Sequence, residues 1–297
     1  MKHILFRCLL FAAALPAIAS GKDFVFAGYN LENYAPLADP GGTPAGKPRK
    51  SEEAAGAVLG VIKEINPDIL GVCEMGSALQ FEEFRKRLEN EKLGYIDSEF
   101  VDAADPDRHL ALVSRFPIVA RQSLTDLSYE SNGVREKVRR GILDITVRVN
   151  DRYLIRIVGA HLKSKRFTPE GDEGERRNEA HLLRNHLSEI LAADPHLNLL
   201  VFGDFNDTKE QPAIREVAGR RGAPEALTAL PLEDNVGDHW THYWKVDDVY
   251  SRIDYLFVNH ALSPEIVRPK SYVYRSPTWN EASDHRPVVA TIHPVEK

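Results

Sequence analysis

Hydrophobic residues in this chain gather in short runs that are typical of β-strands. Continuous apolar runs predict buried strands at residues 24–27, 68–73, 153–160, 197–202, 253–258 and 287–292. Between residues 143 and 149 apolar and polar positions alternate, which predicts a strand with one face exposed to solvent. Residues 110–114 and 117–121 are expected to form two strands that pair about a short turn.

Helical periodicity predicts three helices between these strands. Ser51 is a favourable N-cap, the acidic residues after it suit the positive end of the helix dipole, and Asn66-Pro67 ends the helix. The second helix has its apolar side between Phe81 and Leu88, and the third spans residues 175–191. Because several strands follow one another without a helix between them, the pattern favours a mixed-sheet α/β sandwich. The strict alternation and the glycine fingerprint of a Rossmann fold are absent.

Residues 1–20 have the organisation of a signal peptide. A positively charged start precedes an apolar run at residues 8–15, and the small-x-small sequence Ala17-Ile18-Ala19 is typical of a signal-peptidase site. The run is shorter than the roughly 20 apolar residues that a membrane anchor needs, so export is a better interpretation than an anchor or a core helix. We therefore expect a secreted or periplasmic protein with no stable membrane anchor, whose residues 21–297 form a single domain.

Charge and cysteine content narrow the picture further. Removal of residues 1–20 takes away Lys2 and Arg7 and no acidic residue, so the formal charge moves from −6 to −8. An acidic protein is a poor candidate for tight, sequence-independent binding of nucleic acid, although a nuclease needs only a locally basic cleft. Cys73 then remains as the only cysteine, which cannot form an internal disulfide, and its apolar surroundings predict a buried structural thiol.

A segment rich in proline and glycine follows the first predicted strand, at residues 35–49. Its composition breaks regular structure, and at about 15 residues it exceeds the usual length of a connection. Such loops are often functional, and the sequence leaves the role of this one open.

Polar residues stand at or beside the ends of the apolar strands. Six separate segments carry them: Asn30, Glu74, His161, Asp204 with Asn206, Asp254, and the pair Asp284-His285 before the last strand. Any single one of them is explained most simply as a turn former or a satisfied strand-end side chain. Their recurrence favours a shared site, because loops at the end of a rigid sheet are where catalytic groups are displayed. No cysteine–histidine spacing of a thiolate zinc site occurs.

Seven short segments contain these residues and span nearly the whole chain after residue 20. They are YNLEN at 29–33, GVCE at 71–74, ALVSRFPI at 111–118, GAHL at 159–162, GDFN at 203–206, RIDY at 252–255 and SDHRPV at 283–288. In this order they resemble the endonuclease/exonuclease/phosphatase superfamily, which includes deoxyribonucleases, apurinic-site endonucleases, neutral sphingomyelinases and inositol-polyphosphate phosphatases. The resemblance implies a four-layer α/β sandwich with two packed mixed β-sheets flanked by helices, and an active site at one rim.

The resemblance also implies a cofactor, Mg²⁺ or Mn²⁺. Glu74 would be the main ligand, Asn30 would lie beside it, and Asp284 would be a further metal or water contact. Carboxylate and amide oxygens suit such ions, which keep several waters for a substrate phosphate.

Catalytic roles follow from the same resemblance. Asp204 would orient the attacking water, and Asn206 would donate to the phosphate oxygens, since residues i and i+2 at a strand end can face the same side. Asp254 would hold His285 in the right tautomer and stabilise its charged form. Apurinic-site endonucleases usually lack a histidine at the position of His161, whereas the deoxyribonuclease, sphingomyelinase and phosphatase branches have one. The two imidazoles would divide the acid and base roles across the scissile P–O bond.

Basic and aromatic residues near these segments are candidates for substrate contact. Arg108 is the candidate phosphate contact, with Asp107 as a partner of His161, although a surface ion pair or a turn explains both equally well. Lys163 follows a predicted catalytic strand end, where it would contact a substrate phosphate, and a solvated loop is the alternative. The aromatic residues between 240 and 244 suit stacking on a base or an apolar leaving-group pocket, and core packing is as good an explanation.

The leading hypothesis is a secreted nuclease or phosphodiesterase that uses one or two divalent ions for attack of water on phosphorus. The alternative is a phosphomonoesterase or a lipid phosphodiesterase. A lipid substrate would predict an exposed apolar hairpin near the rim, and the sequence does not indicate one. A non-catalytic binding module on the same fold would have lost a core residue, and all are present. No segment indicates a protein partner, and we expect a monomer that binds a phosphate ester, with nucleic acid as the first candidate.

Overall fold

The computed structural model describes residues 21–34, 50–131, 133–165 and 173–295. Its strands form two six-stranded sheets and two small hairpins. The first sheet has the order β15 (Tyr272–Val273), β16 (Val288–Ile292), β1 (Phe24–Tyr34), β2 (Ile69–Met75), β4 (His109–Ser114) and β3 (Asp97–Val101). The second has the order β11 (Thr228–Ala229), β14 (Asp254–Val258), β10 (Leu199–Asp204), β9 (Tyr153–His161), β8 (Ile142–Asn150) and β5 (Ile118–Arg121). The predicted signal peptide and the loop at 35–49 lie outside the described residues.

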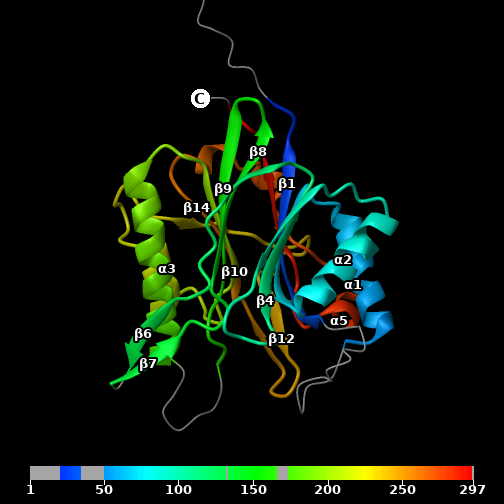
Figure 1. Ribbon diagram of the computed structural model, residues 1–297. Coiled ribbons are helices and arrows are strands. Elements are labelled where there is room, and N and C mark those ends of the chain that lie inside the picture. The colour runs from blue at the N-terminus through cyan, green and yellow to red at the C-terminus, as the bar shows by residue number, and fades with distance from the viewer. Residues whose placement is uncertain (1–20, 35–49, 132, 166–172, 296–297) are drawn as a thin grey trace, which may run out of the picture.

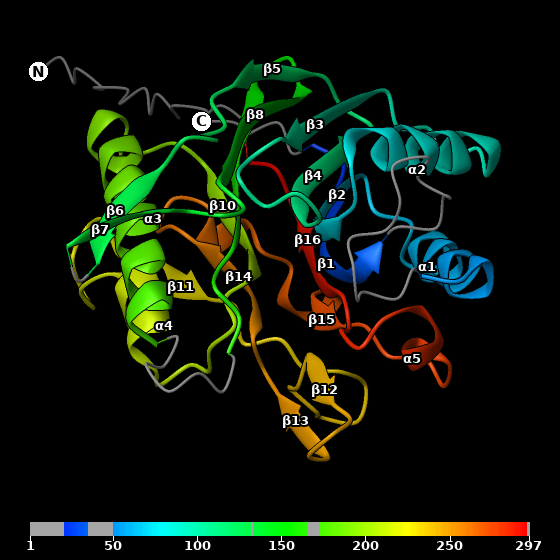
Figure 2. The same cartoon turned by 60° about the horizontal axis from the view of Figure 1, so that its bottom comes forward.

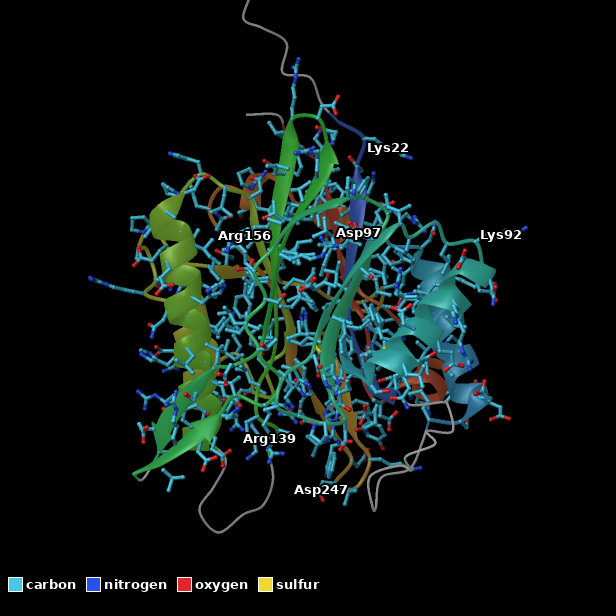
Figure 3. The ribbon with its side chains drawn as sticks, in the orientation of Figure 1. Lys22, Lys92, Asp97, Arg139, Arg156 and Asp247 are labelled. Atoms are coloured by element: carbon cyan, nitrogen blue, oxygen red, sulfur yellow. The ribbon has the colours of Figure 1, made fainter. Side chains whose placement is uncertain are left out.

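The two sheets pack on each other, and helices cover their outer faces (Figure 1). Helices α1 (Glu52–Ile65) and α2 (Ala78–Asn90) lie on the first sheet, and α3 (Glu173–Ala193) and α4 (Pro212–Ala218) lie on the second. Buried apolar side chains fill the space between the sheets and both spaces between sheet and helix (Figure 3). The four-layer α/β sandwich with two mixed sheets is thus confirmed as the fold class.

Local signals in the sequence account for the helix ends. The Ser51 side chain accepts a hydrogen bond from the Ala54 N–H, which caps the first turn of α1. Asn66 ends the helix in the left-handed conformation, with φ of 50°. The short helix α5 (Trp279–Ala282) and two 3-10 turns, η1 (Ser263–Glu265) and η2 (Arg268–Lys270), complete the helical elements that the structure describes.

The expected pairing of residues 110–114 with 117–121 is wrong. Strand β4 pairs with β2 and β3 in the first sheet, so both of its edges are filled. Strand β5 instead pairs with β8 in the second sheet. The connection between them carries the chain from one sheet to the other, and Phe116 packs its ring against Phe24 at 6.0 Å in the space between.

The prediction that one face of β8 is exposed is also wrong at its first half. Asp144 was expected in solvent, but its side chain is fully buried. Its carboxylate accepts hydrogen bonds from Arg156 at 2.6 Å and pairs with His186 of α3 at 2.7 Å. Helix α3 covers this face of the sheet, so the Asp144 side chain lies in an ion-pair network with Arg156 and His186 and not in water.

Two small hairpins stand outside the main sheets. One is formed by β6 (Ser128–Ser131) and β7 (Val134–Lys137), and the other by β12 (His242–Trp244) and β13 (Val249–Ser251). Figure 2 shows the second hairpin projecting from the body of the molecule, next to the ends of the central strands. Among the described residues, no helix is long and apolar enough to span a membrane.

Candidate active site

The central strands bring the predicted polar residues to one rim. Strands β1 and β2 are parallel neighbours in one sheet, and β9 and β10 are parallel neighbours in the other. Parallel neighbours end at the same edge, which places Asn30 beside the end of β2 and His161 directly opposite Asp204. Strand β14 runs antiparallel to β10, so Asp254 at its start lies on the other side of Asp204.

The Asp204 carboxylate lies at the centre of this cluster. It accepts a hydrogen bond from the Asn30 side-chain amide at 3.0 Å, and the backbone N–H of Asn206 donates to it at 2.9 Å. The Nε2 atoms of His161 and His285 lie 3.6 and 3.8 Å from its Oδ2. Burial and then the nearby charge of Asp254 raise the pKa of Asp204 to about 7. Asp204 therefore joins residues from both sheets and can exchange a proton near neutral pH.

His285 is fixed through its other ring nitrogen. Its Nδ1 donates to the Asp254 carboxylate at 2.8 Å, which directs Nε2 toward Asp204. Burial alone would lower the pKa of His285, but the carboxylates of Asp254 and Asp204 raise it well above its ordinary value. The Thr241 hydroxyl accepts from the Asp254 N–H at 3.0 Å, and the His285 N–H donates to Ser283 at 3.0 Å, so both partners are held by the backbone.

His161 has the opposite electrostatic setting. Its side chain is 2% exposed, and burial lowers its pKa well below the ordinary value, with further contributions from the charges of Arg140 and Arg108. Its Nε2 lies 3.8 Å from Glu74, while none of the described residues hydrogen-bonds to its buried Nδ1. The site thus pairs one imidazole that favours the charged form with one that favours the neutral form.

Acidic residues line the more open side of the rim. Glu74 sits at φ of 60°, a strained conformation for a non-glycine residue, and the Asn33 N–H donates to its carboxylate at 2.9 Å. The Asp284 N–H donates to Glu32 at 3.2 Å, and Lys50 lies 3.6 Å from Glu32. Burial and then the charge of Asp284 raise the pKa of Glu32. Neither Glu32 nor Lys50 was singled out from the sequence, although Glu32 lies within the YNLEN segment.

The other predicted residues are distributed around this cluster. Arg108 lies at the rim, with Nε 3.3 Å from the Glu74 carboxylate. The Asn206 side chain donates to the Leu162 carbonyl at 3.0 Å, so part of its donor capacity is used within the protein. The Lys163 ammonium lies 2.6 Å from Glu175 at the start of α3. Phosphate contacts by these three side chains, and a pairing of Asp107 with His161, stay predictions.

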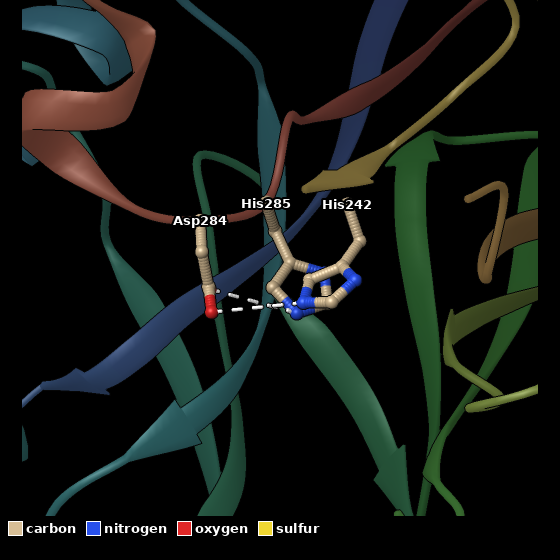
Figure 4. Close-up of side chains that lie close together, drawn as sticks. All are labelled: His242, Asp284 and His285. Atoms are coloured by element: carbon tan, nitrogen blue, oxygen red, sulfur yellow. Dashed lines mark ion pairs between the residues drawn. The ribbon is translucent and has the colours of Figure 1, made fainter. Parts of the chain in front are cut away.

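Sequence reasoning missed His242. It lies on β12, and its ring is 4.5 Å from the His285 ring between centroids. Figure 4 shows the two imidazoles side by side, both facing Asp284, whose carboxylate lies 3.7 Å from each Nε2. In the sequence, His242 alternates with aromatic residues, which could have indicated a strand. The strands of this hairpin have only three residues each, and so short a pattern does not identify a strand.

Comparison with known proteins decides which family carries this arrangement. The model of the Endonuclease/Exonuclease/phosphatase family matches residues 29–285. The chain belongs to the endonuclease/exonuclease/phosphatase family. This confirms the resemblance that the seven sequence segments indicated. No curated protein matches the chain.

Solved structures of this family have the same fold. Truncated TDP2 of Caenorhabditis elegans has a TM-score of 0.64 at 15% identity, covering 92% of this chain and 98% of that one. The human Nocturnin catalytic domain with bound sulfate anion has a TM-score of 0.63 at 19% identity, covering 93% and 96%. An endonuclease/exonuclease/phosphatase from Bacteroides vulgatus has a TM-score of 0.63 at 16% identity, covering 93% and 100%. At these identities the likeness shows the fold alone.

Proteins of the endonuclease/exonuclease/phosphatase family typically use a divalent metal ion. The residues at the rim fit such an ion, because carboxylates from three segments lie close together and Asp284 Oδ1 is buried without a hydrogen bond from any described residue. Two groups also place their ligand atoms within 4.8 Å of one another: His242, Asp284 and His285, and Asp204, Asp254 and His285. The donor set contains both oxygen and imidazole nitrogen, so its chemistry suits more than one metal.

Proposed function

We propose that this chain is an exported, divalent-metal-dependent phosphodiesterase of the nuclease class. The observation that carries the proposal is the Asp204 carboxylate, buried between two imidazoles at 3.6 and 3.8 Å and facing an acidic rim. Membership of a family of phosphoester hydrolases supports hydrolysis at this site. The signal-peptide pattern in residues 1–20 supports export to the periplasm or the medium.

Side chains of this chain can perform both proton transfers of such a reaction. Asp204 would orient a water molecule and accept its proton as the water attacks phosphorus, since its raised pKa makes it a better base than an ordinary carboxylate. His285, whose charged form Asp254 stabilises, would donate its Nε2 proton to the leaving oxygen as the P–O bond breaks. His161, buried and neutral, would contribute a hydrogen bond without adding charge.

Glu74, Asn30 and Asp284 are the residues that would hold Mg²⁺ or Mn²⁺, and the ion would supply Lewis-acid stabilisation of the negative phosphate. Arg108 lies 3.3 Å from Glu74 and would add a planar cation next to the same phosphate. Glu74 thus lies between acidic residues that would hold a cation and the Arg108 guanidinium, and both positive charges would attract a phosphate.

The alternative is a phosphomonoesterase or a lipid phosphodiesterase. The sequence did not indicate an exposed apolar hairpin near the rim, but β12–β13 is one. Trp244, Val246 and Val249 on this hairpin are 47%, 79% and 46% exposed. The preference for the nuclease class over a lipid substrate therefore rests on the two acidic residues in the turn of this hairpin, Asp247 and Asp248, which would be costly to insert into a bilayer.

Purified protein assayed on DNA, RNA, bis-p-nitrophenyl phosphate and p-nitrophenyl phosphate tests the proposal. We expect activity on at least one diester with Mg²⁺ or Mn²⁺, and loss of that activity with chelator. His285→Ala should reduce kcat by roughly 100-fold or more, whereas His181→Ala, an exposed histidine on α3, should not change it. Turnover that is unchanged in His285→Ala would refute the site, and preference for the monoester would favour the alternative.

A further inference from the structure

The hairpin β12–β13 has two chemically different faces. Side chains alternate along a strand, so His242 and Trp244 share one face and Tyr243 lies on the other. Cross-strand partners share a face, which places Val249 beside Trp244 and Tyr250 beside Tyr243. One face thus looks toward the catalytic residues, through His242, and the other looks away.

The face that looks away fixes the hairpin to the body of the protein. Tyr243 and Tyr250 stack at 4.5 Å, and Trp240 packs edge-on against both Tyr250 at 4.8 Å and Trp279 at 5.1 Å. The buried Arg286 guanidinium lies 3.9 Å from the Trp240 ring. These ring contacts fix the hairpin to the body of the protein, although Tyr250 is still 52% exposed.

Backbone hydrogen bonds tie the hairpin to the catalytic segment. The Tyr243 N–H donates to the Asp284 carbonyl at 3.0 Å, and the Arg286 N–H donates to Thr241 at 2.6 Å. His242 and His285 form an isolated bridge between these two segments. The position of β12 is thus fixed relative to His285 before any substrate arrives.

The face toward the site ends in an exposed aromatic ring. The His242 ring lies 4.5 Å from His285, and Trp244 follows 6.3 Å from His242, so three rings lead outward from the catalytic cluster. Trp244 is 47% exposed, although the packing of a well-anchored hairpin could have buried it. A rigid, half-exposed indole that is separated from His285 by the His242 ring is suited to stack on a flat ring of a ligand.

We propose that Trp244, with Val249 beside it, forms a stacking platform for an aromatic ring that the scissile phosphate carries, of the size of one nucleobase. The proposal rests on the proposed phosphodiesterase function and names its substrate class. A ring here would be held beside His242 while the phosphate reaches Asp204 and His285. A substrate without a ring next to the phosphate would leave the platform empty.

The composition of the hairpin favours a small aromatic ligand over a lipid surface. Its turn contains the exposed Val246 but also the charged residues Lys245, Asp247 and Asp248, and Figure 3 shows Asp247 at the outer end of the molecule. Tyr243 donates to Asp248 at 3.0 Å, so this acid is part of the turn. Insertion of the tip into a bilayer would bury two carboxylates, which is costly, whereas a ring on the Trp244 face leaves them in water.

Two matched substrates test the platform: a dinucleotide with both bases, and the same diester with abasic sugars. We expect Trp244→Ala to lower kcat/KM on the base-bearing diester by about 10- to 100-fold, mainly through KM, because one stacked base contributes that much to binding. The abasic diester should be hydrolysed equally by both proteins, and Trp244→Phe should retain most of the preference. Ile96→Ala is the control: Ile96 is an apolar residue before β3 that is 66% exposed, and its substitution should change the hydrolysis of neither substrate.

A binding measurement without metal separates this proposal from the catalytic one. Thymidine 5′-monophosphate in chelator should quench part of the tryptophan fluorescence, and this part should be missing in Trp244→Phe. If the protein hydrolyses no phosphodiester but the quenching is present, the proposed function fails and the platform stands. Equal loss on both diesters, or no quenching by the nucleotide, overturns the platform. Loss of binding to phosphatidylcholine vesicles in Trp244→Ala, with base preference unchanged, would overturn it in favour of a membrane contact.

Discussion

The two sheets bring different chemistry to the same rim. Glu74 of the first sheet and Asp284 in the turn before β16 have side chains 14% and 35% exposed. His161 and Asp204 of the second sheet have side chains only 2% exposed. Open carboxylates suit a hydrated cation, whereas buried imidazole and carboxylate groups keep shifted pKa values. Under the proposed function, cation binding and proton transfer would therefore fall mainly on different layers of the sandwich.

His285 joins the two layers. It lies just before β16 of the first sheet, but its Nδ1 donates a hydrogen bond to Asp254 of the second sheet at 2.8 Å. Asn30 makes the reverse connection, from β1 of the first sheet to Asp204 of the second at 3.0 Å. One substitution in each layer tests this division. Glu74→Gln leaves both connections in place, and Asp204→Asn alters only the hydrogen bond from Asn30.

The largest expected effect comes from replacing the carboxylates of Asp204 and Glu74 with amides. Asp204→Asn should lower kcat by about 10²- to 10⁴-fold at any metal concentration, because it removes the buried base. Glu74→Gln should instead raise the metal concentration needed for half-maximal activity by about 10- to 100-fold, with much of the activity restored at high Mn²⁺. The measurement is kcat as a function of metal concentration for both variants. Rescue of Asp204→Asn by metal, or no metal dependence in Glu74→Gln, would contradict the division of roles.

The next effect concerns stability and the buried acid Glu179, which lies on α3 behind the second sheet. Burial raises the pKa of Glu179 to about 7, and its carboxylate accepts the Lys163 N–H at 2.6 Å just beyond His161. Because the pKa of Glu179 is higher in the folded than in the unfolded state, the folded protein binds one more proton at pH values between these two pKa values. Stability from this group is present at low pH and is lost as pH rises from about 4.3 through 7.

Glu179→Gln removes this pH dependence. We expect the variant to gain about 2 kcal/mol over the parent protein between pH 5 and pH 8, since one pKa unit corresponds to about 1.4 kcal/mol. Urea unfolding at the two pH values measures the difference. Glu189→Gln, an exposed position on the same helix, should show no such gain. An equal change in both variants would mean that the effect comes from the net charge of the protein and not from the buried group.

The fold and the site were predictable from the sequence to different extents. Helix ends depend on local chemistry, so Ser51 and Asn66 identified them directly. The ends of buried strands also identified the central cluster, because apolar runs followed by an acid or histidine are visible one segment at a time. The partner of β5 and the burial of Asp144 depend on packing between distant segments, and alternation within one strand could not reveal them.

The site residues that sequence reasoning missed have the same explanation. His242 acts through a hairpin whose strands are short, and Lys50 reaches the rim through a hydrogen bond to the Ala282 carbonyl at 2.7 Å, far away in the sequence. Neither stands at the end of a long apolar run. Residues of this kind become visible only when the register between separate segments is known.

An effect of similar size is expected where the two layers touch. Phe202 of β10 directs its ring at Gly71 of β2, and a Cβ at Gly71 would lie 2.3 Å from the ring. A Cβ at Gly159 of β9, which is the neighbour of β10 in the second sheet, would lie 2.6 Å from the same ring. Gly71→Ala should therefore destabilise the protein by about 1–3 kcal/mol through overpacking, as measured by urea unfolding.

Two further variants decide whether the contact between layers is the cause. Gly56→Ala in α1 has nothing within 4 Å of the new methyl group and should stabilise the protein by about 0.5–1 kcal/mol, the opposite sign. Phe202→Leu combined with Gly71→Ala should recover part of the loss, because a smaller side chain gives the methyl group room. Since Phe202 is two residues from Asp204, Gly71→Ala should also lower kcat, and the double variant should restore it. Additive losses in the double variant would show that the two layers are not coupled through this ring.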